Sequence, residues 1–377
     1  MPRPLRSLAA VLLGATAALG ACAAPPPDAV SAPRANGPAL TTSEDEPRAC
    51  AWFGDVRGDV LYFGISRFWS ASRAARGDPS AELRTNGARE LGRFDLAREL
   101  LLPPLVIAAD ARGGVWDVLA HPNGWLYFTT FFESAGRVDP ETALVEWFDA
   151  AGTGLNELAL VPDGRVLATR YGRDGKSGSV VVLDERGTLL AEHALASEPG
   201  VTSAAKSLAY DASRDAVWLN TDLLPENDAG GEADHDARVL ALSDGRELAR
   251  WRTPELQFMA FAGDGTGFLV ERDAERLLLR IIDPDSHAPL QLAGRSVLLD
   301  DSFPAHDFAQ DVKLAPDGSA VVTRWSGIVH VVSRRGDVRT LALPRLEGAL
   351  YYTAVAQDRE VCATRCAGVE VLCLPAR

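Results

Sequence analysis

A fourteen-residue phrase recurs seven times along the chain and limits what it can fold into. The clearest copies read DVLAHPNGWLYFTT at 117–130, ELALVPDGRVLATR at 157–170 and DVKLAPDGSAVVTR at 311–324. Looser copies begin at Ala51, Ser207, Phe258 and Tyr352. Each copy has the pattern of a strand, a tight polar turn and a second strand. Strand-rich units repeated every ~40–50 residues are typical of a β-propeller. The sequence therefore predicts an all-β propeller.

The outer strands of each blade follow the phrase as further hairpins, such as 179–195 and 238–251. This spacing predicts seven blades, although six or eight stay open. The expected blades are residues 50–107, 108–150, 153–198, 202–253, 255–300, 307–345 and 350–375. The last segment has room for three strands, and residues 40–48 are a weak candidate for a fourth.

The N-terminus has the pattern of a targeting signal. Arg3 and Arg6 precede an apolar stretch of small residues at 7–21, which is too short to span a bilayer. The stretch ends Leu-Gly-Ala-Cys at Cys22, which resembles the bacterial lipobox. That resemblance implies a lipidated Cys22 as the first mature residue; an ordinary secretory signal is the alternative. Acyl chains on one cysteine would anchor the protein to a membrane.

We therefore expect a signal peptide at 1–21, a flexible tether at 22–47 and a propeller domain at 48–377. The tether is rich in Pro, Ala and Ser and has no periodicity. No Asp follows Cys22 to signal retention in the inner membrane, so the expected address in a diderm host is the outer membrane, facing the periplasm. The formal charge of −14 argues against nucleic acid as a partner.

Four cysteines remain after Cys22 in an oxidising compartment. Cys362 and Cys373 lie opposite one another if residues 367–368 form a turn, and Cys50 and Cys366 flank the seam of the ring. The favoured pairs are Cys50–Cys366 and Cys362–Cys373. Four cysteines allow two other pairings, and a structural zinc site is a further alternative.

A candidate ligand site lies at the start of the inner strands, around the upper mouth of the channel. The phrase positions there carry polar or aromatic residues on five successive blades. They are Trp116, Asp117, Asn156, Glu157, Lys206, Gln257, Gln310 and Asp311, joined by Arg170 and Arg324 from the second strands. A wet polar channel without a ligand is the alternative.

Lys313 is unusual for its place in the phrase. The other copies have Phe53, Leu119, Ala159, Ala209, Ala260 and Ala354 there. A lysine at an apolar position needs a counter-charge, and Asp311 on the same strand is the expected partner. A catalytic amine is the alternative.

The loops at the same end of the channel are the longest and most variable. His306 and Asp307 precede the strand of Lys313. Insertions at 67–89, which includes Phe68 and Trp69, and at 222–236 enlarge the same face.

The Pro-Asp-Gly turn followed by an apolar strand resembles NHL-repeat, gluconolactonase-like and virginiamycin-lyase-like propellers, at the level of the fold. Similarity to the gluconolactonase-like group implies a divalent metal in the channel, calcium or magnesium. The residues of suitable type are Asp117, Asn156, Glu157 and Asp311. No histidine motif of the virginiamycin-lyase type is present.

The first functional interpretation is a lipid-anchored propeller that binds a small ligand or an envelope protein. It follows from the tether, the long loops on one face and the lack of a recognisable catalytic motif. The alternative is a metal-dependent hydrolase or lyase of the gluconolactonase-like type.

Overall fold

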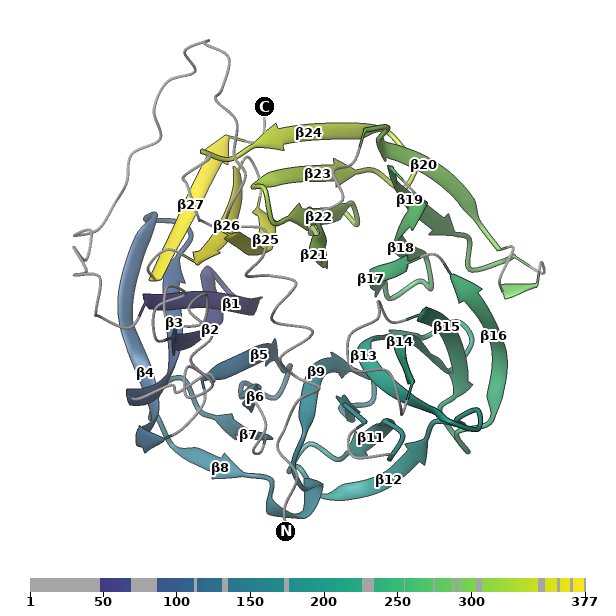
Figure 1. Ribbon diagram of the computed structural model, residues 1–377. Coiled ribbons are helices and arrows are strands. Elements are labelled where there is room, and N and C mark those ends of the chain that lie inside the picture. Colours follow the sequence, from purple (N-terminus) through teal and green to yellow (C-terminus); the bar gives the residue numbers. More distant parts are fainter. Residues whose placement is uncertain are drawn as a thin grey trace, which may run out of the picture.

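Seven antiparallel sheets stand around a central channel like the blades of a propeller (Figure 1). This confirms the predicted all-β, seven-bladed fold. The computed structural model describes residues 48–68, 87–111, 114–130, 135–172, 176–225, 234–253, 255–273, 275–286, 289–290, 293–302, 307–344, 350–357, 360–366 and 369–375. The predicted signal peptide and the whole predicted tether, together with Trp69 and His306, lie outside these residues.

The strands of each sheet follow one another in chain order, from the channel to the rim. The first three blades are β1 (Arg48–Arg57), β2 (Val60–Phe68), β3 (Gly87–Asp95) and β4 (Leu100–Ala111); β5 (Val115–Ala120), β6 (Leu126–Thr130), β7 (Ala135–Val138) and β8 (Val145–Trp147); and β9 (Leu155–Leu160), β10 (Val166–Arg170), β11 (Ser179–Leu183) and β12 (Leu189–Ala194). A short 3-10 helix, η3 (Asp149–Ala151), joins the second and third blades.

The remaining blades repeat this arrangement, although the last one has three strands among the described residues. They are β13 (Val201–Asp211), β14 (Ala216–Pro225), β15 (Asp234–Ala241) and β16 (Glu247–Thr253); β17 (Glu255–Phe261), β18 (Gly267–Asp273), β19 (Arg276–Ile282) and β20 (Arg295–Asp300); β21 (Ala309–Leu314), β22 (Ala320–Arg324), β23 (Ile328–Val332) and β24 (Val338–Ala342); and β25 (Leu350–Gln357), β26 (Glu360–Cys366) and β27 (Val369–Pro375).

The Pro-Asp-Gly turn between the first two strands of a blade explains why the phrase repeats. In the third blade Gly164 has a φ of 91°, a left-handed conformation that glycine adopts without steric cost. Asp163 stabilises the turn because its Oδ1 accepts the backbone N–H of Arg165 at 3.1 Å. Asp317 does the same for Ser319 in the sixth blade, at 2.8 Å.

Every inner strand contains a β-bulge at the same height. In β5, Trp116 and Asp117 together face Thr129 of β6, so the inner strand has one residue more than its partner. The other six inner strands have the same one-residue excess, at 52–53, 156–157, 206, 257–258, 310 and 352–353. A bulge changes where a side chain points, and bulges are common beside functional sites. Here the repeated bulge turns a ring of side chains toward the channel.

The ring closes between the first and last blades by side-chain packing and a disulfide. Cys50 of β1 is bonded to Cys366 of β26, across 316 residues of sequence, and Cys362 is bonded to Cys373 within the last blade. Both predicted pairs are confirmed. Thr364 also donates a hydrogen bond to the backbone oxygen of Trp52 at 3.1 Å. Cross-linking a loop of this length removes about 5 kcal/mol of chain entropy from the unfolded state.

Apolar side chains fill the spaces between neighbouring blades. Leu167 and Val180 of the third blade pack with Leu208 and Leu219 of the fourth, and equivalent clusters join the other blades. Because both faces of a blade are covered in this way, the middle strands are apolar on both faces. Among the described residues, no helix is long and apolar enough to cross a membrane.

Candidate functional site

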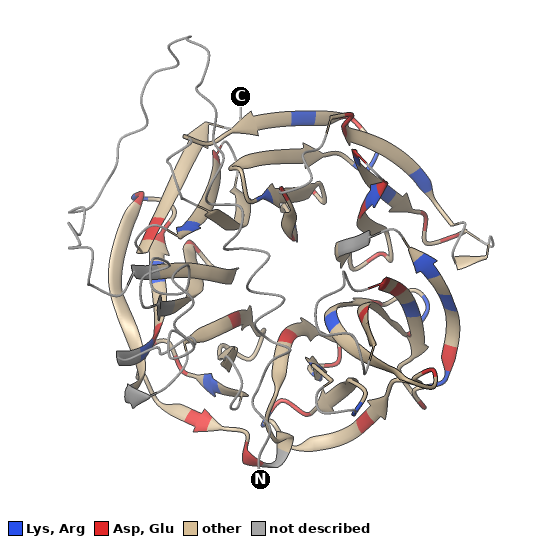
Figure 2. Cartoon of the chain, in the orientation of Figure 1, with Lys and Arg blue, Asp and Glu red and all other residues tan. Residues whose placement is uncertain are grey.

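A cavity of about 250 Å³ lies inside the channel. It begins at the bulges and follows the inner strands toward their ends at the Pro-Asp-Gly turns, as its lining shows. Its apolar lining includes Phe53, Leu158, Leu160, Leu208, Tyr210, Phe258, Met259 and Phe261, and its charged lining is Asp117, Glu157, Asp311 and Lys313. Acidic residues accordingly colour the inner strands β5 and β9 where they border the channel (Figure 2).

The two aspartates that line this cavity each connect their own blade to the next blade through hydrogen bonds. Asp117 accepts the N–H of Val118 in its own strand and the N–H of Leu158 in the next blade, each at 2.8 Å. Asp311 accepts the N–H of Val312 at 2.8 Å and the hydroxyl of Thr353, in the next blade, at 2.6 Å. Both side chains are therefore fixed at both oxygens.

Asp55 is a fourth carboxylate that the sequence comparison missed. It accepts the N–H of Val56 at 2.8 Å and that of Ala120, in the next blade, at 2.9 Å. In each inner strand, equivalent positions can be counted from the last paired residue before the bulge. By this count, Asp55 of the first blade and Val355 of the last blade are the equivalents of Lys313. The expected equivalents, Phe53 and Ala354, were wrong. Aligning the phrases on their turns gives these wrong equivalents, because the turns differ in length. In the first blade the turn is Gly58-Asp59, which has only two residues.

Lys313 supplies the positive charge of the cavity. Its Nζ lies 3.6 Å from Oδ2 of Asp311, which agrees with the expected partner. That separation is an ion pair but is too long for a hydrogen bond. Burial disfavours the ammonium, but Asp311, Asp117, Asp55 and Glu157 outweigh this effect and raise the pKa of Lys313. The lysine therefore stays charged, and it stabilises the four carboxylates around it.

Glu157 differs from the three aspartates because the protein holds it weakly. Its carboxylate accepts the backbone N–H of Leu208. Among the described residues, no other side chain forms an ion pair within 4.0 Å or a hydrogen bond with this carboxylate. Its side chain is the longest of the four, and it lines the cavity. Glu157 is therefore the carboxylate best placed to contact a ligand.

Burial and mutual repulsion raise the pKa values of these carboxyl groups. Burial raises the pKa of Asp117 to about 6, although Lys313 and two backbone N–H groups act against it. Burial, with the charges of Asp117 and Asp311, raises the pKa of Glu157 well above its ordinary value. Burial also raises the pKa of Asp311. Groups with strongly raised pKa values in a cavity are candidates for a functional site.

An aromatic cluster crosses the channel beside the bulges. The ring centroids of Trp52 and Trp116 are 4.7 Å apart, those of Trp52 and Tyr352 are 4.4 Å apart, and those of Phe53 and Phe258 are 5.9 Å apart. Because Phe53 and Phe258 belong to the first and fifth blades, the cluster spans the channel. The start of the inner strands, where we expected a polar mouth, thus also carries stacked rings.

Among the described residues, the other predicted site residues do not line the cavity. Trp116 belongs to the aromatic cluster, Asn156 is half-buried at its bulge, and the side-chain amide of Gln310 lies 3.4 Å from the oxygen of Ala309. Lys206 pairs with Asp222 at 3.7 Å, and the side chain of Gln257 is outside the described residues. In the bulges at 52–53, 116–117 and 156–157, the second residue lines the cavity and the first does not.

The two predicted arginines form ion pairs, Arg170 inside its own blade and Arg324 with a residue beside its own blade and with the last strand of the fifth blade. Arg170 donates to Glu192 at 2.8 Å, and Arg324 donates to Asp307 at 2.7 Å and to Asp300 at 2.6 Å. Arg324 is 2% exposed. Asp307 is likewise buried in this pair. The structure therefore gives both arginines and Asp307 a role in blade stability, and their contribution to ligand binding stays a prediction.

The predicted metal ligands do not converge as a metal site requires. Among the described residues, the carboxylates of Asp117, Glu157 and Asp311 do not form a group whose ligand atoms all lie within 4.8 Å of one another. Asn156 does not line the cavity, and the ammonium of Lys313 lies among the carboxylates where a cation would bind. This donor set would need to rearrange to hold calcium or magnesium.

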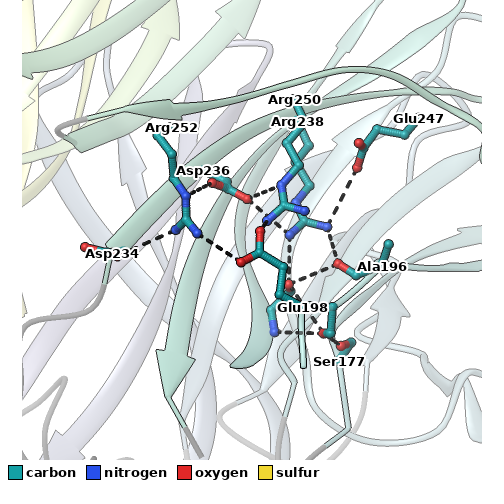
Figure 3. A network of polar contacts seen from close by, with 11 residues as sticks. Ser177, Ala196, Glu198, Asp234, Asp236, Arg238, Glu247, Arg250 and Arg252 are labelled. Atoms are coloured by element: carbon teal, nitrogen blue, oxygen red, sulfur yellow. Dashed lines mark hydrogen bonds and ion pairs between the residues drawn. The ribbon is translucent and has the colours of Figure 1, made fainter. Parts of the chain in front are cut away.

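The fourth blade contains a second buried cluster of charge (Figure 3). Arg238 and Asp236 are fully buried and lie 3.2 Å apart. Arg250 contacts Asp236 at 2.5 Å and Glu198 at 2.7 Å. Arg238 also donates to the backbone oxygen of Ala196 at 2.6 Å, so the cluster ties the fourth blade to the connection from the third.

Comparisons with known proteins support the fold. No protein-family model matches the chain, and no curated protein matches its sequence. The solved structures that it resembles include a streptogramin B lyase, at 12% identity and a TM-score of 0.57, covering 87% of this chain and 94% of the lyase. A catalytically inactive virginiamycin B lyase from Staphylococcus aureus with quinupristin has 12% identity and a TM-score of 0.57, covering 88% and 97%.

The WD40 domain of Neurospora crassa Pan2 is similar at 11% identity and a TM-score of 0.55, covering 89% of this chain and 91% of that domain. Identities this low show the fold alone. They agree with the predicted propeller, and the similarity to gluconolactonase-like enzymes stays a prediction.

Proposed function

We propose that this propeller is a ligand-binding module of the cell envelope and that the cavity behind the bulges is its binding site. One observation supports this most strongly: Glu157 and Lys313 line a cavity that they share with two aspartates and with residues that are mostly apolar in type. Pockets with apolar walls and a few converging polar groups are typical of small-molecule sites. The propeller would supply a rigid frame, since each aspartate of the cavity is fixed by two hydrogen-bond donors.

A ligand screen by thermal unfolding tests the proposal. A compound that binds in the cavity should raise the melting temperature of the wild type but not that of Glu157→Gln or Lys313→Met. Glu192→Gln is the matched control, because Glu192 lies in the same blade and pairs with Arg170 outside the cavity. Compounds that stabilise all four proteins equally would place the site elsewhere.

The envelope location rests on the lipobox-like sequence before Cys22. We propose lipidation at Cys22 and an outer-membrane address facing the periplasm. Replacing the nucleophilic thiol by Cys22→Ser should leave unprocessed precursor and abolish labelling with a fatty-acid analogue. Normal processing and acylation of this variant would contradict the lipoprotein proposal.

A metal-dependent hydrolase or lyase is the second candidate, and the presence of three carboxylates, Asp117, Glu157 and Asp311, in the lining of one cavity favours it. Lys313 competes with a metal for these oxygens, which argues for the binding module first. Elemental analysis of the purified protein, with melting curves in calcium, magnesium and chelator, separates the two. Stoichiometric metal and a chelator-dependent loss of stability would favour the enzyme.

A further inference from the structure

We propose that the cavity selects a small organic cation with an apolar body, such as a primary amine, and that Glu157 binds its charged group with release of a proton. This inference rests on the proposed function, because it names the class of ligand for the same cavity. It does not depend on a metal.

The charge of the cavity favours a cation. Four carboxylates surround the single ammonium of Lys313, which leaves a formal charge of −3 when all are ionised. An anionic ligand would meet this excess at short range in a partly buried site. Glu157 has the free capacity for a cation, since the oxygens of Asp55, Asp117 and Asp311 are already engaged by N–H and O–H donors.

The walls of the cavity favour an organic ligand over a bare ion. The side chains of Leu160, Leu208, Met259 and Phe261 offer apolar contacts, which an organic ligand can use and a small hydrated ion cannot. Phe53 and Phe258 bring ring surfaces to the bulge end, where an ammonium is attracted by aromatic faces. About 250 Å³ suits a ligand of roughly one ring and a short chain.

The charges around Glu157 make binding depend on pH. Asp117 faces it from β5, Asp311 and Lys313 from β21, and their combined effect with burial raises its pKa. Lys206 of the neighbouring β13 is held by Asp222. A bound ammonium would favour the ionised carboxylate. A ligand cation therefore displaces a proton below the raised pKa, and its affinity increases with pH.

Calorimetric titration with three matched probes tests the inference. Benzylamine is the cation, benzyl alcohol the neutral analogue and benzoate the anion. We expect benzylamine to bind at least about tenfold more tightly than benzyl alcohol, and benzoate to bind most weakly. A lost charge-assisted hydrogen bond should lower benzylamine affinity about tenfold in Glu157→Gln, with no change in Glu192→Gln.

Proton release is measured by calorimetry on the wild-type protein, so this part of the test does not require a variant to fold. The binding enthalpy should differ between two buffers of different ionisation enthalpy, and the affinity for benzylamine should increase from pH 5 to pH 8. Equal or tighter binding of benzyl alcohol or benzoate, or no buffer dependence, would overturn the inference but leave the proposed function intact. If none of the probes binds at millimolar concentration, the proposed function fails as well.

Discussion

Two buried clusters of charge are built from similar residues but have different geometry. In the fourth blade, Arg238, Arg250 and Arg252 face Glu198, Asp234, Asp236 and Glu247 through contacts of 2.5 to 3.8 Å (Figure 3). In the channel, one lysine faces four carboxylates, and its ion pair with Asp311 has an N–O distance of 3.6 Å. The first cluster is nearly balanced, whereas the second has an excess of negative charge.

The difference separates a structural cluster from a site able to bind. A guanidinium has five N–H donors in a fixed plane, so Arg238 and Arg250 can satisfy several oxygens at once. Lysine is a compact charge, and among the described residues no cation lies within 4.0 Å of the carboxylate of Glu157. A cluster in which each charged side chain has an ion pair stabilises one conformation of the protein. A cluster with a carboxylate that has no ion pair gains more interaction free energy when a cation binds.

The largest expected effect comes from breaking the balanced cluster. Arg238→Met should lower the free energy of unfolding by about 3–5 kcal/mol, because Asp236 would keep a buried charge with fewer partners. Urea denaturation measures this. Arg246→Met is the control, since that side chain is 68% exposed and its loss should cost within about 0.5 kcal/mol. Equal losses for the two variants would show that the buried cluster contributes little.

The next effect concerns the lysine of the unbalanced cluster. Lys313→Met should cost about 2 kcal/mol of unfolding free energy at pH 8, because the four carboxylates then repel one another without a counter-charge. The cost should be smaller at pH 5, where Asp117, with a pKa of about 6, and Glu157 take up protons. Denaturation at the two pH values tests this, and a cost independent of pH would contradict it.

Glu157→Gln should have a smaller effect of opposite sign. The raised pKa of Glu157 means that the folded protein holds this proton more tightly than the unfolded chain. The wild type therefore loses stability as pH rises from the ordinary value toward the raised one, and glutamine avoids this loss. The variant should melt higher than the wild type at pH 8 and about equally near pH 4.

Glu192 supplies the matched contrast, because Ser179 and Arg170 outweigh burial and lower its pKa. Its contribution to stability is present above the ordinary pKa and is lost as pH falls through the lowered one. Glu192→Gln should therefore melt lower than the wild type at pH 8. The same sign for both variants would remove the distinction between the two kinds of carboxylate.

The smallest effect is expected at the rim of the fourth-blade cluster. Arg252 is 50% exposed, and it contacts Glu198 and Asp236 at 3.3 and 3.4 Å. Exposed pairs contribute little, so Arg252→Ala should cost less than about 1 kcal/mol and less still in high salt. A cost as large as that of Arg238→Met would mean that solvent exposure does not divide the cluster as we argue.

The fold and part of the site could be predicted because their signals are local. The repeated strand–turn–strand phrase predicted seven blades, with six or eight left open, and Asp117, Glu157 and Asp311 were found because they share one position of the phrase. The Cys50–Cys366 pair was expected from the closure of the ring, and the Cys362–Cys373 pair from a turn at 367–368. Lys313 was recognised by its contrast with the apolar residues at its place in the other copies of the phrase.

The rest depended on geometry that the repeat does not encode. A bulge cannot be read from one strand, because it is defined by the partner strand, and it decides that Asp117 lines the cavity while Trp116 stacks with Trp52. Asp55 was missed because the turn of its blade has a different length. Arg170 and Arg324 stand at matching strand ends, yet each has a carboxylate of its own blade within reach.

The pKa values of the cavity carboxyl groups test most directly the claim that this cavity can bind a cation. Carbon-13 NMR titration of the carboxyl groups, assigned with Glu157→Gln and Asp117→Asn, measures their pKa values in the folded protein. We predict a midpoint near pH 6 for Asp117 and one well above the ordinary 4.5 for Glu157. Addition of benzylamine should lower the midpoint of Glu157. Midpoints at the ordinary 3.8 and 4.5, unchanged by the amine, would show well-solvated carboxylates and contradict a cavity ready to bind a cation.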